Sequence, residues 1–211
     1  MKEITPEMLR ELREQIAQRM SAKRLRHTLA VEDMVARLCA LYCPAHTSAM
    51  RAAALLHDLT KELSLHEQIA LSLELGLPVS PADQCSPKTF HARTAAALIR
   101  RDLPQFDDPI ITEAVRWHTT GHSGMTLTEK LLYLADYIDD SRTFESCVTL
   151  RRHFWDADPA AMDEAARKAL LADTLLLSYD LTIRDLLSEG APVAVDTMNA
   201  RNELIYQKKG V

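Results

Sequence analysis

Apolar residues recur at helical spacing over most of the chain, and capping residues mark where the segments begin. Thr5-Pro6 joins a favoured N-cap residue to proline at the first helical position, which predicts an amphipathic helix to about Gln18. Ser21 is the expected cap of a second helix that ends before Pro44. The apolar positions of that helix follow a helical period at Leu25, Leu29, Met34, Leu38 and Leu41.

The middle of the chain predicts further helices, separated by glycine and proline. They run from about Ser48 to Asp58, Ser64 to Leu75, Thr89 to Asp102, Asp107 to His118 and Thr126 to Asp139. Gly76 is an expected stop, because glycine accepts the left-handed conformation that ends many helices. The three prolines of LPVSPADQCSPK (77–88) predict a loop.

The C-terminal part predicts a long helix and a short one. Asp158-Pro159 is expected to open an Ala/Leu-rich helix that Gly190 ends, with a kink or break near Ser178 left open. A last helix is expected after a turn, capped by Asp196, and the strand-like run VAV (193–195) is too short to build a sheet. We therefore predict an all-α fold with residues 1–211 in one domain. Whether the residues after about 145 form a separate lobe stays open.

Composition and charge narrow the class of protein. Apolar residues make up 47% and charged residues 26%, as in ordinary globular domains. No apolar run approaches the roughly 20 residues of a membrane span, and the charged N-terminus is unlike a signal or transit peptide. We expect a cytoplasmic protein that does not contact a membrane. The net charge of −5 disfavours general nucleic-acid binding but is compatible with a small phosphorylated ligand.

Several histidines and aspartates stand where packing alone would not place them. His27 lies on the second helix between apolar neighbours, and His57-Asp58 ends the apolar run ALLHD. Asp136 is the one charged residue in LLYLADYI, where an unpaired carboxylate would cost several kcal/mol. A cation would resolve that cost, and a salt bridge to Arg142 is the competing explanation. The simpler alternatives for the others are a satisfied core or surface histidine and a histidine that interacts with a helix dipole.

His91 and His118 extend this set, because each follows an aromatic residue at a predicted helix end. A mixed imidazole and carboxylate set suits iron, manganese or zinc, and differs from the all-oxygen ligands that calcium prefers. Cysteine is absent from the set, which argues against a structural zinc site. The sequence therefore predicts a divalent metal centre and leaves the metal open among these three.

The order His27, His57-Asp58, Asp136 resembles the HD-domain metal phosphohydrolase superfamily. The segments RLRHTLAVEDM (24–34), AALLHDLTKEL (53–63) and WHTTGHSGMTLTEKLLYLADYIDDSR (117–142) are similar to the YqeK family of symmetrical bis(5′-nucleosyl)-tetraphosphatases. The resemblance covers about residues 20–145 and, more weakly, the tail to about 200. It implies an HD-domain helical bundle with a metal-binding core at about 20–145 and C-terminal helices at about 146–211. It also implies hydrolysis of diadenosine tetraphosphate to two ADP, with iron as the metal.

The resemblance assigns roles to individual residues. It implies four metal ligands, which are His27, His57, Asp58 and Asp136. It implies that His91 and His118 face the phosphates or support a second ion, and that Lys61, Glu62 and Arg142 lie by the nucleotide. The catalytic candidates are Asp58, Lys61, His91 and His118. The candidates for substrate binding are Arg24, His27, Lys61, Glu62, His91, His118, Asp136 and Arg142.

Chemistry supports these roles and leaves alternatives. Arg24, Lys61 and Arg142 can offset the charge of a polyphosphate, although each is also an ordinary surface cation. Asp58 or Asp136 can accept a proton from water, and His91 or His118 can steady the attacked phosphoryl group or protonate the leaving one. An HD-superfamily phosphatase for another nucleotide and a non-catalytic nucleotide-binding regulator are the competing functions. A homodimer stays open.

Overall fold

The computed structural model describes residues 3–210, apart from the side chain of Ala82, and this part of the chain contains helices and no strands. The first helices of the chain are α1 (Pro6–Ala17), α2 (Ala22–Tyr42), the short 3₁₀ helix η1 (Pro44–His46) and α3 (Thr47–Leu56). Next come α4 (Leu65–Glu74), α5 (Pro81–Cys85), η2 (Pro87–Thr89), α6 (Phe90–Asp102), η3 (Pro104–Phe106), α7 (Pro109–Trp117) and α8 (Leu127–Ile138). The C-terminal helices are α9 (Glu145–Trp155), α10 (Glu164–Ser188) and α11 (Val195–Lys209). The predicted all-α class is confirmed.

The predicted N-terminal caps are confirmed. The Thr5 hydroxyl accepts a hydrogen bond from the Met8 backbone N–H at 3.3 Å, and the Ser21 hydroxyl accepts one from Arg24 at 3.2 Å. Such bonds satisfy backbone donors that the first turn of a helix leaves unpaired. The N-cap of α2 is thereby fixed three residues before Arg24 and six before His27.

Three predictions of local structure were wrong, one helix was not predicted, and the question of a kink near Ser178 is answered. The 77–88 loop contains α5 and η2, and α9 was not predicted, because its N-cap Phe144 offers no side-chain cap. Asp158 does not open α10: its backbone φ is 53°, the chain makes a turn after it, and Asp163 caps the helix instead. α10 runs without a break past Ser178. Asp196 lies in the first turn of α11, whose N-cap is Ala194.

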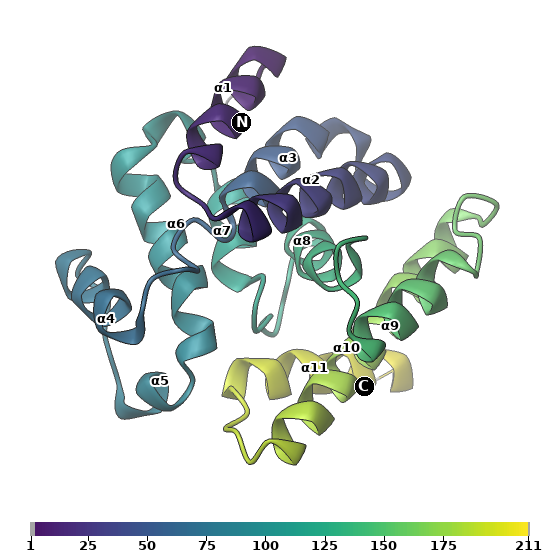
Figure 1. The fold of residues 1–211 in the computed structure, drawn as a ribbon. Helices are drawn as coiled ribbons and strands as arrows, with labels where there is room; N and C mark the ends of the chain where they lie inside the picture. The colour runs from purple at the N-terminus through teal and green to yellow at the C-terminus, as the bar shows by residue number, and fades with distance from the viewer. Residues whose placement is uncertain (1–2, 211) are drawn as a thin grey trace.

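The site is framed by α2, α3, α7 and α8, which pack against one another at the centre of the molecule (Figure 1). α8 contacts α2, α3 and α7 on one side and α9 and α10 on the other. α4 and α5 lie at one edge, and α9 to α11 lie at the opposite edge (Figure 1). No helix in residues 3–210 is long and apolar enough to cross a bilayer.

The C-terminal helices share the hydrophobic core of the rest of the chain. The rings of Tyr133 on α8 and Tyr179 on α10 lie 4.9 Å apart, and the Ser178 hydroxyl donates a hydrogen bond to the Tyr133 oxygen at 3.2 Å. Both tyrosines belong to the same buried cluster as Leu12 of α1. This continuity supports the prediction of a single domain, which stays a prediction.

Gly121 follows the end of α7, at a position that has no space for a side chain. Its φ is 62°, and a Cβ at this position would collide with the Tyr179 hydroxyl and lie 3.0 Å from the Met125 sulfur. We expect Gly121→Ala to lower the free energy of unfolding by about 1–3 kcal/mol, because both the left-handed backbone and the overpacking are unfavourable. Urea denaturation measures this change. Tyr179→Phe in the Gly121→Ala background should recover part of the loss, and an undiminished loss would contradict the steric explanation.

Candidate functional site

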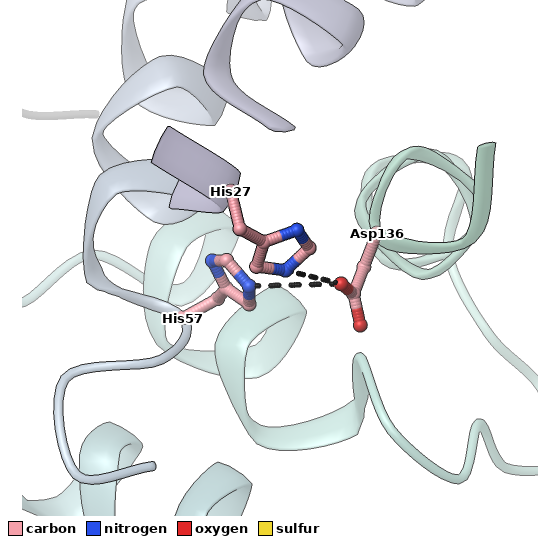
Figure 2. Close-up of side chains that lie close together, drawn as sticks. All are labelled: His27, His57 and Asp136. Carbon is pink, nitrogen blue, oxygen red and sulfur yellow. Dashed lines mark ion pairs between the residues drawn. The ribbon is translucent and has the colours of Figure 1, made fainter. Parts of the chain in front are cut away.

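Three histidine and aspartate side chains from separate helices converge beside the α2–α8 contact (Figure 2). His27 comes from the second turn of α2, His57 from the end of α3, and Asp136 from α8. His27 Nε2 lies 2.9 Å and His57 Nε2 lies 3.8 Å from Asp136 Oδ1. The chain therefore brings together, from positions more than 100 residues apart, the groups that the sequence singled out.

Asp58 links this group to a second one. Its Oδ2 atom lies 3.3 Å from His57 Nε2 and 3.7 Å from His27 Nε2, while its Oδ1 atom faces the other way. Oδ1 lies 3.2 Å from His91 Nε2 and 3.9 Å from His118 Nε2. All six predicted imidazole and carboxylate groups thus lie in one continuous cluster around this buried carboxylate.

Two of the histidines are oriented by the helix ends at which they stand. His57 and His118 are the C-cap residues of α3 and α7. His57 Nδ1 lies 2.6 Å from the Ala54 carbonyl oxygen, and His118 Nδ1 lies 2.7 Å from that of Val115. Each carbonyl is one that the helix end leaves without an intrahelical donor. Since a carbonyl only accepts, Nδ1 carries the proton and the Nε2 lone pair points into the cluster.

The cluster has the donor chemistry of a metal site. Within residues 3–210, the buried Nε2 atoms of His27 and His57 have no hydrogen-bond partner, although carboxylate oxygens lie close to both. A buried polar atom left in this way costs about 1–3 kcal/mol. Two sets of ligand atoms lie within 4.8 Å of one another, namely His27, His57 and Asp136, and His57, Asp58 and His118. The nitrogen and oxygen lone pairs of these side chains point toward one another and not toward a hydrogen-bond donor. This arrangement suits a divalent cation with nitrogen and oxygen ligands.

The pKa values of the histidines shift in opposite directions on the two sides of Asp58. Burial lowers the pKa of His27, but the nearby carboxylates of Asp136 and Asp139 outweigh it and raise that pKa to about 9. A cation at Nε2 therefore competes with a proton. On the other side, burial lowers the pKa of His91, and burial with the neighbouring His57 holds the pKa of His118 well below its usual range. These two imidazoles are accordingly neutral near pH 7.

Three cations line the same cluster. Arg24 forms an ion pair with Asp58, and Arg142 forms one with Asp136 while its Nε donates to the Asp136 carbonyl oxygen at 2.5 Å. The Lys61 ammonium lies 3.3 Å from each ring nitrogen of His91. The alternative weighed from the sequence, a salt bridge from Arg142 to Asp136, is thus present, but it coexists with the histidine contacts. Burial opposes the charge on Asp136, yet Arg142 and His27 hold its pKa well below its usual range.

Glu62 is the predicted site residue that lies outside the cluster. Its carboxylate accepts hydrogen bonds from the Ser21 backbone N–H at 2.9 Å and from the Ser21 hydroxyl at 2.5 Å. It therefore anchors the start of α2, one turn before Arg24. Its role in substrate binding stays a prediction.

Two side chains of the cluster, those of Thr119 and Asp139, were not predicted from the sequence. The Thr119 hydroxyl lies 3.3 Å from His91 Nε2 and 3.2 Å from His118 Nε2. Asp139 is fully buried, with Oδ2 at 3.3 Å from His27 Nδ1. The position of Thr119 directly after His118 was a usable signal, whereas Asp139 lies at the end of a helix where an aspartate is unremarkable.

Known proteins resemble the chain over most of its length. The HD domain family matches residues 24–140. Proteins named symmetrical bis(5′-nucleosyl)-tetraphosphatase from Bacillus subtilis and Halalkalibacterium halodurans are each 28% identical, over 90% of this chain and 94% and 93% of theirs. The one from Staphylococcus aureus is 31% identical over 64% of this chain and 68% of its own. A Clostridium acetobutylicum structure, described as a predicted HD superfamily hydrolase involved in NAD metabolism, aligns with a TM-score of 0.80 at 29% identity, covering 93% of this chain and 96% of that one.

The family match spans the helices that carry the cluster, from Arg24 through Asp136. The histidine and aspartate ligand set and the family match together indicate a divalent metal-binding site. The similarity to the curated relatives continues beyond that match, into the C-terminal helices. The chain therefore belongs to the HD domain family, in the group of the symmetrical bis(5′-nucleosyl)-tetraphosphatases.

Proposed function

We propose that this protein is a metal-dependent phosphohydrolase that cleaves diadenosine tetraphosphate at its central anhydride to give two ADP. The observation that carries the proposal is the convergence of His27, His57, Asp58 and Asp136 from three segments, with three cations against them. The relatives named for this activity are 28–31% identical to the chain. Diadenosine tetraphosphate is a polyanion, so its cleavage depends chiefly on positioning and charge neutralisation.

The ligands of the proposed ion are His27, His57, Asp58 and Asp136, and we propose iron as the metal. Manganese and zinc suit the same nitrogen and oxygen donors. His91 and His118, on the Oδ1 side of Asp58, are placed for a second ion or for the phosphates. When bound, a divalent ion supplies polarisation of a phosphoryl oxygen and activation of a water nucleophile.

The remaining steps belong to side chains of the protein. Lys61, Arg24 and Arg142 offset the negative charge of the phosphate chain. Asp58 is held ionised by His57 and His91 despite its burial, which keeps its pKa well below the usual range. It is therefore available to accept a proton from the attacking water.

His91 is the better candidate for donating a hydrogen bond to the leaving phosphate, because its neutral imidazole keeps one N–H. Its Nε2 lies 3.0 Å from His118 Nε2. The proton on His118 is already at Nδ1, facing the Val115 carbonyl, so the proton shared by the two Nε2 atoms belongs to His91. His118 then orients the His91 ring, and the Thr119 hydroxyl completes this contact.

The proposal also covers the cellular location and the oligomeric state of the protein. We place the activity in the cytoplasm, since the proposed substrate is a nucleotide. A nucleic-acid partner is not expected for a chain with a net charge of −5. A homodimer is compatible with the proposed site, which needs no residue from a second copy.

Product identification tests the function. The protein should be purified without oxygen, its metals measured by elemental analysis, and its reaction with diadenosine tetraphosphate followed by chromatography. Two ADP per substrate are expected. ATP plus AMP would contradict symmetrical cleavage, preferential turnover of AMP or dAMP would favour a nucleotide phosphatase, and binding without turnover under reducing conditions would favour a regulator.

Arg24→Ala tests the contribution of the cations to substrate binding. A hydrogen bond to a charged group contributes about 1.5–3 kcal/mol, so kcat/KM should fall about 10- to 100-fold. Arg26→Ala is the matched control, because Arg26 is exposed on the same helix. Steady-state kinetics compare the two variants, and equal losses in both would contradict a specific role for Arg24.

A further inference from the structure

Asp139 is buried against His27, and one of its two carboxylate oxygens has no hydrogen-bond partner among the described residues. It follows the last residue of α8 and is fully buried. Its Oδ1 atom accepts hydrogen bonds from the backbone N–H of Ser141, at 2.9 Å, and from the Ser141 hydroxyl. Among the described residues, its Oδ2 atom has no hydrogen-bond partner, although it lies 3.3 Å from His27 Nδ1 and 3.4 Å from Arg142 Nε. A buried carboxylate oxygen without a hydrogen bond requires an explanation.

The turn that carries Asp139 is held firmly in place. Arg151 of α9 donates from Nε to the Ile138 carbonyl at 2.8 Å and from Nη2 to the Arg142 carbonyl at 2.8 Å. The same guanidinium also donates to the Asp139 carbonyl. The Ile138 and Asp139 carbonyls lie at the end of α8, where helix carbonyls lack intrahelical donors, and the Arg142 carbonyl lies beyond the turn. The position of the Asp139 carboxylate is therefore fixed by the backbone on which it stands.

His27 differs from the other inward-facing histidines in its place on a helix. His57 and His118 stand at helix ends, where a spare backbone carbonyl accepts the Nδ1 proton. His27 lies inside α2, where carbonyls are engaged in the bonds of the helix. Its Nδ1 must find a side-chain acceptor, and the side chains within reach are Asp139 and Ser141, each at 3.3 Å.

We propose that Asp139 is a positioning residue that holds the proton of His27 on Nδ1 and so leaves Nε2 free to bind the divalent ion. This inference rests on the proposed metal site. Nε2 faces Asp136 at 2.9 Å while Nδ1 faces Asp139, so the imidazole is held between two carboxylates. A carboxylate behind a metal-binding histidine fixes its tautomer and makes it a stronger ligand. Ser141 completes the arrangement, since its hydroxyl donates to Asp139 and presents its oxygen to His27 Nδ1.

Asp139→Asn is the test variant, because it keeps the shape and the acceptor for Ser141 but removes the charge. Asp140→Asn is the matched control: Asp140 is the next residue, is 64% exposed and pairs with Arg37. Zn²⁺ is the probe, titrated into metal-free protein in competition with a chromophoric chelator. Removing such a carboxylate weakens metal affinity about 10- to 100-fold, and that loss is expected for Asp139→Asn alone.

Long-range ¹H–¹⁵N spectra of the Zn²⁺-loaded protein supply a readout that fold stability does not move. The unaltered protein should show His27 protonated at Nδ1, and Asp139→Asn should show a loss of that state. If the unaltered protein binds Zn²⁺ and Asp139→Asn binds it as tightly with Nδ1 still protonated, the inference is overturned while the metal site stands. A fall in Tm with unchanged affinity overturns it as well. Failure of the unaltered protein to bind a divalent ion would sink the proposed function itself.

Discussion

Asp58→Asn is expected to lower kcat for diadenosine tetraphosphate about 10³-fold, because a divalent ion contributes several kcal/mol to the transition state and 1.36 kcal/mol corresponds to tenfold. Asp58 is 3% exposed and contacts both histidine groups, with Oδ2 toward His57 and Oδ1 toward His91. An amide in its place presents a donor to one of these groups and carries no charge to hold an ion. The same substitution removes the proposed proton acceptor. Loss of the metal and loss of turnover should therefore occur together.

Elemental analysis and initial rates measure this prediction on one preparation. Asp33→Asn is the control, since Asp33 is exposed on α2, the helix that carries His27. Asp58→Asn leaves the Arg24 guanidinium without its carboxylate partner, so thermal unfolding should be recorded to show that the variant is folded. A folded variant that retains full metal content and turnover would remove Asp58 from the reaction.

Much of the helical pattern could be predicted, because its signals are local. Thr5 and Ser21 cap the helices that follow them, and each cap depends on three or four successive residues. The errors occurred where a local signal had a competing solution. Asp158-Pro159 has the form of a helix start, but Asp158 takes a φ of 53° and the chain turns until Asp163. α9 begins without any side-chain cap, so its start carried no local signal.

The candidate site could be predicted in part, because burying Asp136 among apolar residues is costly and implies a partner. The sequence does not show where an orienting group comes from. Asp139 reaches His27 through the turn after α8, which Arg151 of α9 holds, and that helix was itself not predicted. Glu62 shows the converse: its motif suggests contact with a nucleotide, while its carboxylate is engaged by Ser21 at the start of α2. Such roles depend on tertiary contacts that spacing along the chain does not encode.

Two histidines of the site, His57 and His118, have a structural role and a chemical role at the same time. His57 and His118 each satisfy the carbonyl at the end of a helix and, by doing so, direct Nε2 into the cluster. The helix end thus sets the tautomer that a metal ligand or a proton acceptor needs. Carboxylates and cations are likewise paired: Asp58 with Arg24 and Asp136 with Arg142. A divalent ion bound at these carboxylates would add its charge to that of Arg24 and Arg142 facing the phosphates.

Lys61→Met is expected to lower kcat about 10²-fold, the effect of removing one preorganised donor from a transition state. Lys61 is the cation of the cluster that pairs with no carboxylate within 4 Å in the described part of the chain, so its charge is free for the phosphates. Burial lowers its pKa, while Asp58 and Asp136 oppose that change and favour the ammonium form. Its place 3.3 Å from the His91 ring nitrogens sets it beside the proposed hydrogen-bond donor, where charge develops on the leaving phosphate.

Methionine keeps most of the length of the lysine side chain and its apolar stem, so packing should change little. Lys88→Met, at a position 78% exposed, controls for the loss of one positive charge. Steady-state kinetics and metal analysis together separate the roles of Lys61. A fall in kcat with the metal content unchanged supports a transition-state role, because the ion is held by other side chains. If kcat is unchanged and only Tm falls, Lys61 serves as a structural counter-ion for Asp58 and Asp136, and the neutralisation of the phosphates rests on Arg24 and Arg142.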